Sequence, residues 1–461
     1  STPFDAAQRT LAREATTERG ARGILPLLEL WNAWDQVDPA VTFELLQGIV
    51  DNRRVPQERR DYARSLLARA EIRRGHLEQA VEITRDLGYV TDWQVIGPFD
   101  NEGKQGFERE DGPEEHRMAA FDADVRYPGK EREVQWRPYP DITRVGYVDF
   151  DALFRPYANV CGYAQTTIVS ERSQSLALSL GGGGAIAVWW NGEKVHSDNV
   201  YREPDPDRSR ALVGAHAGVN RLLVKTCVTE STWGFYLRVT DPNGRAPRGV
   251  THVGAALAEA AGAGHGARLP RARPTIFETL QAAANAERAS GRDLYDLARY
   301  LQWSGSDDPA EFPARQLAAR AAEADPQLDH LLFASRLQEQ RGDRMRFAAQ
   351  ALERYPNAPE AHLLHAQLVA AGLHGEDALP VLDRIEPIAQ SGTMGMQAAV
   401  LRARILQEMD LPQAARRVVE NAGRHAPNAP GWLRLRAEYL AAANNPDAAV
   451  ELRTRAVAQQ W

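Results

Sequence analysis

The sequence predicts a multidomain protein in which helical repeats flank an antiparallel β-sandwich. Residue usage changes abruptly at Trp93, from Ala-, Leu- and Arg-rich segments with helical spacing to segments rich in Trp, Tyr, Val and Gly. Apolar residues then alternate with period two as far as Gly244, after which helical composition returns. We therefore expect four parts: a helical arm over 1–90, a sandwich over 91–246, a linker over 247–274 and a helical array over 275–461.

The helical segments contain an internal repeat. Pro356-Asn357-Ala358-Pro359 recurs as Pro427-Asn428-Ala429-Pro430, about two repeat lengths of 34 residues further along the chain. Alanines also recur in pairs with a constant spacing, at Ala68 and Ala80, Ala366 and Ala378, Ala403 and Ala415, and Ala437 and Ala449. These positions resemble the tetratricopeptide repeat, in which small residues let two antiparallel helices approach closely. The resemblance implies helix pairs over 61–87 and 359–461, whereas residues 275–355 show helical periodicity without a clear register.

Such an array is expected to act first as a packing scaffold, because each helix pair must cover its apolar stripe with its neighbours. The resemblance also implies a concave face that binds a peptide or a protein partner. The polar residues proposed to line that face are His362, His365, Arg402, Arg404 and Arg436.

The segment after Trp93 has the pattern of half-buried strands. Leu176, Leu178 and Leu180 alternate with small residues, as expected when one face of a strand is buried. Asn191-Gly192 predicts a two-residue hairpin, because a type I′ turn needs positive φ at both central residues. Trp189 lies on the opposite face of its strand from the apolar residues that end at Trp190, and we expect its ring to point outward.

This segment resembles the galactose-binding-like jelly rolls that serve as sugar-binding modules of glycoside hydrolases and as accessory domains of exported bacterial proteins. The matching stretches are Trp93 with Ile96-Gly97-Pro98-Phe99, Val188-Trp189-Trp190-Asn191-Gly192, Gly218 to Lys225 and Trp233 to Val239. Together with the flanking repeats, the chain is similar to the front part of exported transglutaminase-like repeat proteins. The resemblance implies a periplasmic or cell-surface location, although no transglutaminase-like catalytic region is recognisable.

Composition excludes several classes of partner. The net charge of −7 and the isoelectric point near 5.9 argue against a nucleic-acid partner, because proteins that bind nucleic acid usually present a concentrated basic face. No apolar run approaches the roughly 18–20 residues needed to span a bilayer. The chain begins at Ser1 without a leader and ends at Trp461 without a polar capping helix, so we expect the natural protein to extend beyond both ends.

Cys161 and Cys227 both lie in the β segment, where a disulfide is possible if their strands are neighbours. Two buried free thiols are the alternative. No Cys-x-x-Cys or paired histidine motif predicts zinc, and no cofactor is expected. The metal content stays open, because Asp100-Asn101-Glu102 offers oxygen atoms that suit a structural Ca²⁺ ion as well as an Asx turn.

Two loop clusters are candidates for ligand binding. Sugar sites combine an aromatic platform with carboxylate or amide groups for the hydroxyls, and the loops predicted here contain both. The candidate ligand-binding residues are Asp100, Asn101, Trp189, Tyr201, Asp205 and Asp207.

No catalytic motif supports an enzyme. The Gly181 to Gly184 run lacks the Lys-Ser/Thr pair of a phosphate-binding loop, and no nucleophile elbow or zinc-protease helix is present. The preferred hypothesis is a non-catalytic protein whose jelly roll binds glycan or a partner surface and whose repeats bind protein. The alternatives are the non-catalytic front part of a larger enzyme, transglutaminase-like or a glycan hydrolase, and a pure scaffold that binds nothing through its jelly roll.

Overall fold

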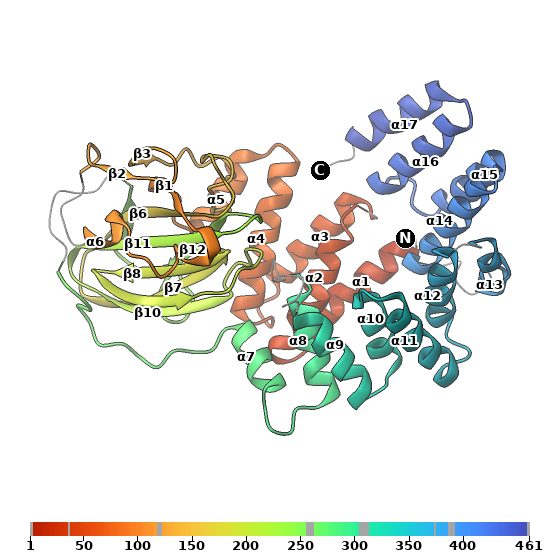
Figure 1. Cartoon of the computed structure of the whole chain (residues 1–461), viewed down its shortest axis with the longest axis horizontal. Helices are drawn as coiled ribbons and strands as arrows, with labels where there is room; N and C mark the ends of the chain where they lie inside the picture. The colour runs from red at the N-terminus through yellow and green to blue at the C-terminus, as the bar shows by residue number, and fades with distance from the viewer. Residues whose placement is uncertain are drawn as a thin grey trace. The chain divides into compact units, whose positions relative to one another are not determined.

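The computed structural model describes residues 3–35, 37–117, 122–254, 262–303, 313–372, 375–385 and 392–458. The chain divides into two compact units (Figure 1). A helical unit comprises Ser1–Gly75, Ala283–Arg299 and Ala314–Trp461, and a β unit comprises His76–Ala282 and Tyr300–Pro313. The first division therefore falls at Gly75, whereas the sequence placed the end of the helical arm at residue 90.

The helical unit is built almost entirely from short helices joined by tight turns. None of the helices in the described part of the chain has the length and apolarity needed to cross a membrane. The elements are α1 (Pro3–Thr17), η1 (Gly20–Gly23), α2 (Ile24–Asn32), α3 (Pro39–Asp51), α4 (Gln57–Arg73), most of α8 (Gly291–Leu301), α9 (Pro313–Ala324), α10 (Leu328–Leu337), α11 (Arg341–Arg354), α12 (Pro359–Ala370), η4 (Gly375–Ala378), α13 (Leu379–Ile385), α14 (Gly392–Glu408), α15 (Pro412–Gly423), α16 (Pro430–Ala442) and α17 (Pro446–Ala458).

Proline and left-handed residues set the limits of the C-terminal helices. Pro412 and Pro430 occupy the first turns of α15 and α16, where the missing N–H costs no hydrogen bond. Asp410 and Asn444 have φ near 59°, which reverses the chain between α14 and α15 and between α16 and α17. Three-residue connections of this kind place consecutive helices side by side and antiparallel.

The repeat alanines are buried where consecutive helices meet. Ala403 and Ala415 are fully buried in one apolar cluster, and Ala437 and Ala449 are buried in the next. In the described part of 359–461, the predicted helices and their small contact positions are thus confirmed. For the earlier unit, α4 and α5 (Leu77–Asp86) are both helical, but α5 belongs to the β unit.

Replacing Ala437 with leucine is expected to lower the free energy of unfolding by about 1–3 kcal/mol, because the new side chain would overpack a fully buried position. Ala441 lies one turn further along the same helix and is exposed, so leucine there should change stability by less than about 0.5 kcal/mol. Urea denaturation of both variants measures the difference. Equal midpoints for the two would show that the repeat register is wrong.

The β unit contains two antiparallel sheets that share one core (Figure 1). In the large sheet the strand order is β4 (Arg137–Pro138), β1 (Gln94–Asp100), β6 (Val160–Ser170), β11 (Gly218–Val228), β8 (Ala185–Trp190) and β9 (Glu193–Asp198). A further strand, β13 (Val250–Val253), also pairs with β6. The small sheet has the order β10 (Ser209–Ala215), β7 (Gln174–Gly183), β12 (Gly234–Thr240) and β5 (Tyr147–Asp149). The remaining elements of the unit are η2 (Glu102–Lys104), α6 (Gly112–Glu115), β2 (Arg126–Pro128), β3 (Glu133–Gln135) and α7 (Ile276–Ala284), whose last residues belong to the helical unit.

The core between the sheets follows the predicted alternation. Leu176, Leu178 and Leu180 from β7 lie in the same cluster as Val188 and Trp190 from β8. The hairpin between β8 and β9 also forms as predicted, with φ of 50° at Asn191 and 81° at Gly192. The expected linker is only partly a linker, because β13 (Val250–Val253) pairs with β6 in the large sheet.

A second apolar layer covers the outer face of the large sheet. Phe99 on β1 and Phe107 and Trp136 from the segment between β1 and β5 cluster with outward-facing residues of β6, β8 and β11. The large sheet is therefore covered on both faces. Two of the predicted site residues, Trp189 and Tyr201, belong to this layer.

Candidate functional site

Asn101 and Tyr201 come together, but inside the protein. Asn101 is fully buried and Tyr201 is 5% exposed. The Asn101 side-chain amide donates hydrogen bonds to the Tyr201 hydroxyl oxygen at 3.1 Å and to the Val228 carbonyl at 3.0 Å. Its oxygen accepts from the Gly106 N–H at 3.0 Å. These contacts join two distant loops, and the Tyr201 ring does not offer an open face to a sugar.

Asp100 lies next to a lysine that neutralises the acidic loop. The Lys130 ammonium is 2.7 Å from a Glu102 carboxylate oxygen and 3.4 Å from one of Asp100. It also donates a hydrogen bond to the Asn159 carbonyl at 2.8 Å. The ammonium thus lies beside the Asp100 and Glu102 carboxylates, which were the open possibility for a structural Ca²⁺ ion. In the described part of the chain, no group of three or more His, Cys, Asp or Glu side chains is arranged to hold a metal ion.

The two aspartates of the second loop point to different partners. Asp207 forms a two-pronged ion pair with Arg238 on β12, with nitrogen–oxygen distances of 2.7 and 2.6 Å. Asp205 is 8% exposed and accepts a hydrogen bond from the Tyr300 hydroxyl. Both contacts attach the loop after β9 to the rest of the β unit.

Trp189 is buried, contrary to the expectation that its ring points outward to solvent. It does lie on the opposite face from Trp190, as the alternation predicts, but it is only 4% exposed because the second apolar layer covers that face. The Lys194 ammonium lies 5.1 Å from the centre of the Trp189 ring. Neither of the two predicted aromatic platforms is therefore accessible to a pyranose.

A buried ion pair crosses the same outer layer. Lys225 is fully buried on β11, and its ammonium donates to the Glu114 carboxylate at 2.6 Å and to the Arg109 carbonyl at 2.7 Å. The Tyr163 hydroxyl donates to the same Glu114 oxygen at 2.7 Å. Burial lowers the pKa of Lys225 below its usual value, and the Glu114 carboxylate opposes this shift. The sequence signal for this pair was a lysine directly after the apolar run from Leu222 to Val224.

Cys161 and Cys227 form a disulfide bond. They are directly opposite each other on the neighbouring strands β6 and β11, and both are fully buried. The open alternative between a bond and two free thiols is thus decided in favour of the bond.

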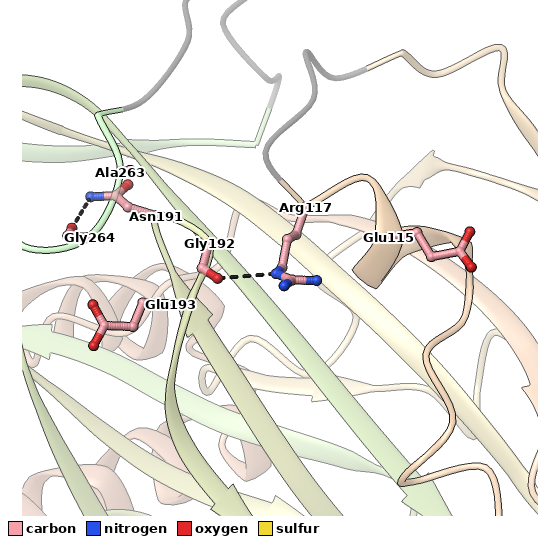
Figure 2. Close-up of a pocket in the computed structure, with 7 residues that line it drawn as sticks. All are labelled: Glu115, Arg117, Asn191, Gly192, Glu193, Ala263 and Gly264. Carbon is pink, nitrogen blue, oxygen red and sulfur yellow. Dashed lines mark hydrogen bonds between the residues drawn. The ribbon is translucent and has the colours of Figure 1, made fainter.

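A polar pocket of about 410 Å³ lies at the β8–β9 hairpin (Figure 2). It is lined by Glu115, Arg117, Asn191, Gly192, Glu193, Ala263 and Gly264. Figure 2 shows Arg117 between Glu115 and the Gly192 carbonyl, to which its Nε donates at 3.1 Å. The Asn191 side chain donates a hydrogen bond to the Gly264 carbonyl at 3.1 Å, which connects two of the segments that line the pocket.

This pocket can hydrogen-bond a polar ligand. The carboxylates of Glu115 and Glu193 accept hydrogen bonds, and the guanidinium of Arg117 donates them. No aromatic side chain is among its lining residues. The sequence did not identify the pocket, because Glu115 and Glu193 belong to segments far apart in the chain.

No protein-family model matches the chain, and no curated protein matches it. Several solved structures are similar to part of the chain at low TM-scores. MamA is 14% identical with a TM-score of 0.27, covering 32% of this chain and 87% of its own. The tetratricopeptide-repeat protein TTC0263 of Thermus thermophilus is 19% identical with a TM-score of 0.28, covering 37% and 87%. Yeast Tom70 is 17% identical with a TM-score of 0.32, covering 39% and 38%.

Proposed function

We propose that this chain is a non-catalytic interaction protein, in which tetratricopeptide-like repeats bind a protein partner and the β unit is a jelly roll that binds glycan. An exported location, periplasmic or on the cell surface, is part of the proposal. The Cys161–Cys227 disulfide supports it, because such bonds persist mainly in oxidising compartments. The polar pocket of Figure 2 supports a ligand rich in hydroxyl groups.

One observation carries the protein-binding part of the proposal. The first helix of each of the last two helix pairs carries an exposed charged residue at the same repeat position. These residues are Arg404 on α14 and Glu438 on α16. Each directly follows a buried repeat alanine, Ala403 or Ala437, so the two residues occupy equivalent places on their helices. A surface that carries an exposed arginine and an exposed glutamate on neighbouring repeats suits an extended peptide of complementary charge.

Several of the other residues predicted to line this face already contact neighbouring residues of the helical unit. Arg402 pairs with Asp383 at 2.7 Å, and His362 contacts the Pro356 carbonyl at 2.8 Å. The stem of Arg436 packs against Gly423, and burial lowers the pKa of His365. Arg404 is the member of that set with the most accessible guanidinium, since more than half of its side chain is exposed while it pairs with Glu408.

A peptide selection tests this part. Peptides selected from a display library on the intact protein are expected to bind about tenfold more weakly to an Arg404→Glu, Glu438→Lys variant, because both charges are reversed. The matched control is Glu451→Lys, Arg453→Glu on α17, where both residues are also exposed. If no peptide is selected, or if both variants bind equally, the repeats do not bind peptide through this surface.

A further inference from the structure

A second pocket, of about 600 Å³, opens beside the small sheet. It is lined by Ser175, Pro242, Asn243, Arg268, Leu269, Pro270, Arg271 and Arg273. Ser175 is near the start of β7, and Asn243 belongs to the turn after β12. Pro242 belongs to the same turn, and the other residues come from the segment that leads to α7, which the sequence assigned to the linker.

Three arginines give this pocket a strong positive charge. Arg268, Arg271 and Arg273 are all exposed, and none forms an ion pair with the residues that the structure describes. No carboxylate lines the pocket. The Asp241 carboxylate nearby accepts the backbone N–H groups of Asn243 and Arg245 at 2.8 and 2.9 Å and so stabilises its own turn.

The arginine segment is held in an extended form before any ligand arrives. Pro270 and Pro274 restrict it to extended backbone, which rises about 3.1 Å per residue in the polyproline form. The Ser175 hydroxyl donates to the Arg268 carbonyl at 2.7 Å at one end, and the Thr275 hydroxyl donates to the Arg208 carbonyl at 2.8 Å at the other. Little conformational entropy is therefore lost when a ligand binds along it.

The spacing of the charges suits a chain-like ligand. An ideal polyproline backbone rises about 3.1 Å per residue, which would separate the α-carbons of Arg268 and Arg271 by about 9 Å and those of Arg271 and Arg273 by about 6 Å. Three cations in a row can contact successive anionic groups of a linear polymer. A guanidinium also matches a carboxylate with two parallel hydrogen bonds, which an ammonium cannot do.

We propose that this pocket binds a linear acidic polysaccharide through the carboxylates of its uronic acid units. This inference rests on the proposed glycan-binding function of the β unit and assigns it a ligand class. The Asn243 amide supplies further hydrogen bonds for hydroxyl groups. No aromatic ring lines the pocket to stack with a nucleobase, and the net charge of −7 opposes a long polyphosphate.

Affinity measurements with the full chain test the proposal. The probes are polygalacturonate, neutral galactan and polyglutamate. The pocket variant combines Arg268→Gln, Arg271→Gln and Arg273→Gln. The control variant has the same charge change and combines Arg85→Gln, Arg132→Gln and Arg172→Gln. The control arginines are exposed in the same unit and do not line the pocket. Circular dichroism establishes that both variants fold.

The wild type and the control are expected to bind polygalacturonate, more weakly as salt is added. The pocket variant should bind at least about tenfold more weakly, since charge-assisted hydrogen bonds are lost. Equal losses in both variants, or tighter binding of polyglutamate, would overturn the assignment. Binding of galactan without polygalacturonate would leave the glycan function standing and overturn the acidic ligand. Binding of neither polysaccharide would count against the glycan function itself.

Discussion

Replacing Glu114 with alanine is expected to lower the free energy of unfolding by about 3–5 kcal/mol. The substitution leaves the Lys225 ammonium fully buried without its carboxylate partner. The Tyr163 hydroxyl loses its closer acceptor and keeps only the Asp111 carboxylate, at 3.4 Å. Because burial already lowers the pKa of Lys225, loss of Glu114 should lower it further and favour the neutral amine. Chemical denaturation at neutral pH measures the loss of stability.

A double variant separates the lost pair from the lost packing. Glu114→Gln with Lys225→Met removes both charges while keeping similar volumes, so it should be markedly more stable than Glu114→Ala. The surface pair Arg126–Glu133 in the same unit provides a reference, since Glu133→Ala should cost less than about 1 kcal/mol. A Glu114→Ala protein as stable as the Glu133→Ala protein would show that the buried pair does not form.

Replacing both Cys161 and Cys227 with alanine is expected to cost about 2–4 kcal/mol, because the bond removes conformational freedom from the unfolded chain. The two cysteines are separated by 66 residues in the sequence, so the closed loop is long. Thermal melting of the wild type should shift downward in the presence of a reductant, and melting of the double variant should not change. A wild type that melts identically with and without reductant would contradict the bond.

The parts of the fold that sequence predicted depend on local patterns. The period-two alternation around Leu178 and the Asn191-Gly192 turn are properties of short stretches, and the structure contains both. The repeat alanines were predictable for the same reason, because the close approach of two adjacent helices needs small residues at fixed positions in a short stretch of sequence. Ala403 and Ala437 are accordingly buried as expected.

The candidate site was harder to predict, because its residues depend on partners far along the chain. Asn101 donates a hydrogen bond to Tyr201, and Asp207 forms an ion pair with Arg238. The polar residues of these loops therefore connect segments that are far apart in the sequence. Trp189 was expected outside, although Ala185 and Ala187 on its face are also apolar. A strand that is apolar on both faces indicates a sheet covered on both sides, and this signal could have corrected the expectation.

Hydrogen exchange of the intact protein, measured with and without polygalacturonate, tests most directly the claim that the β unit binds a ligand through its arginine pocket. The segment from Arg268 to Arg273 has exposed backbone and should exchange rapidly in the free protein. The account predicts slower exchange there and around Asn243 when the polymer is added, with no change in the loop around Tyr201. Slowing that is confined to the Tyr201 loop or to the helical unit, or no slowing anywhere, would contradict it.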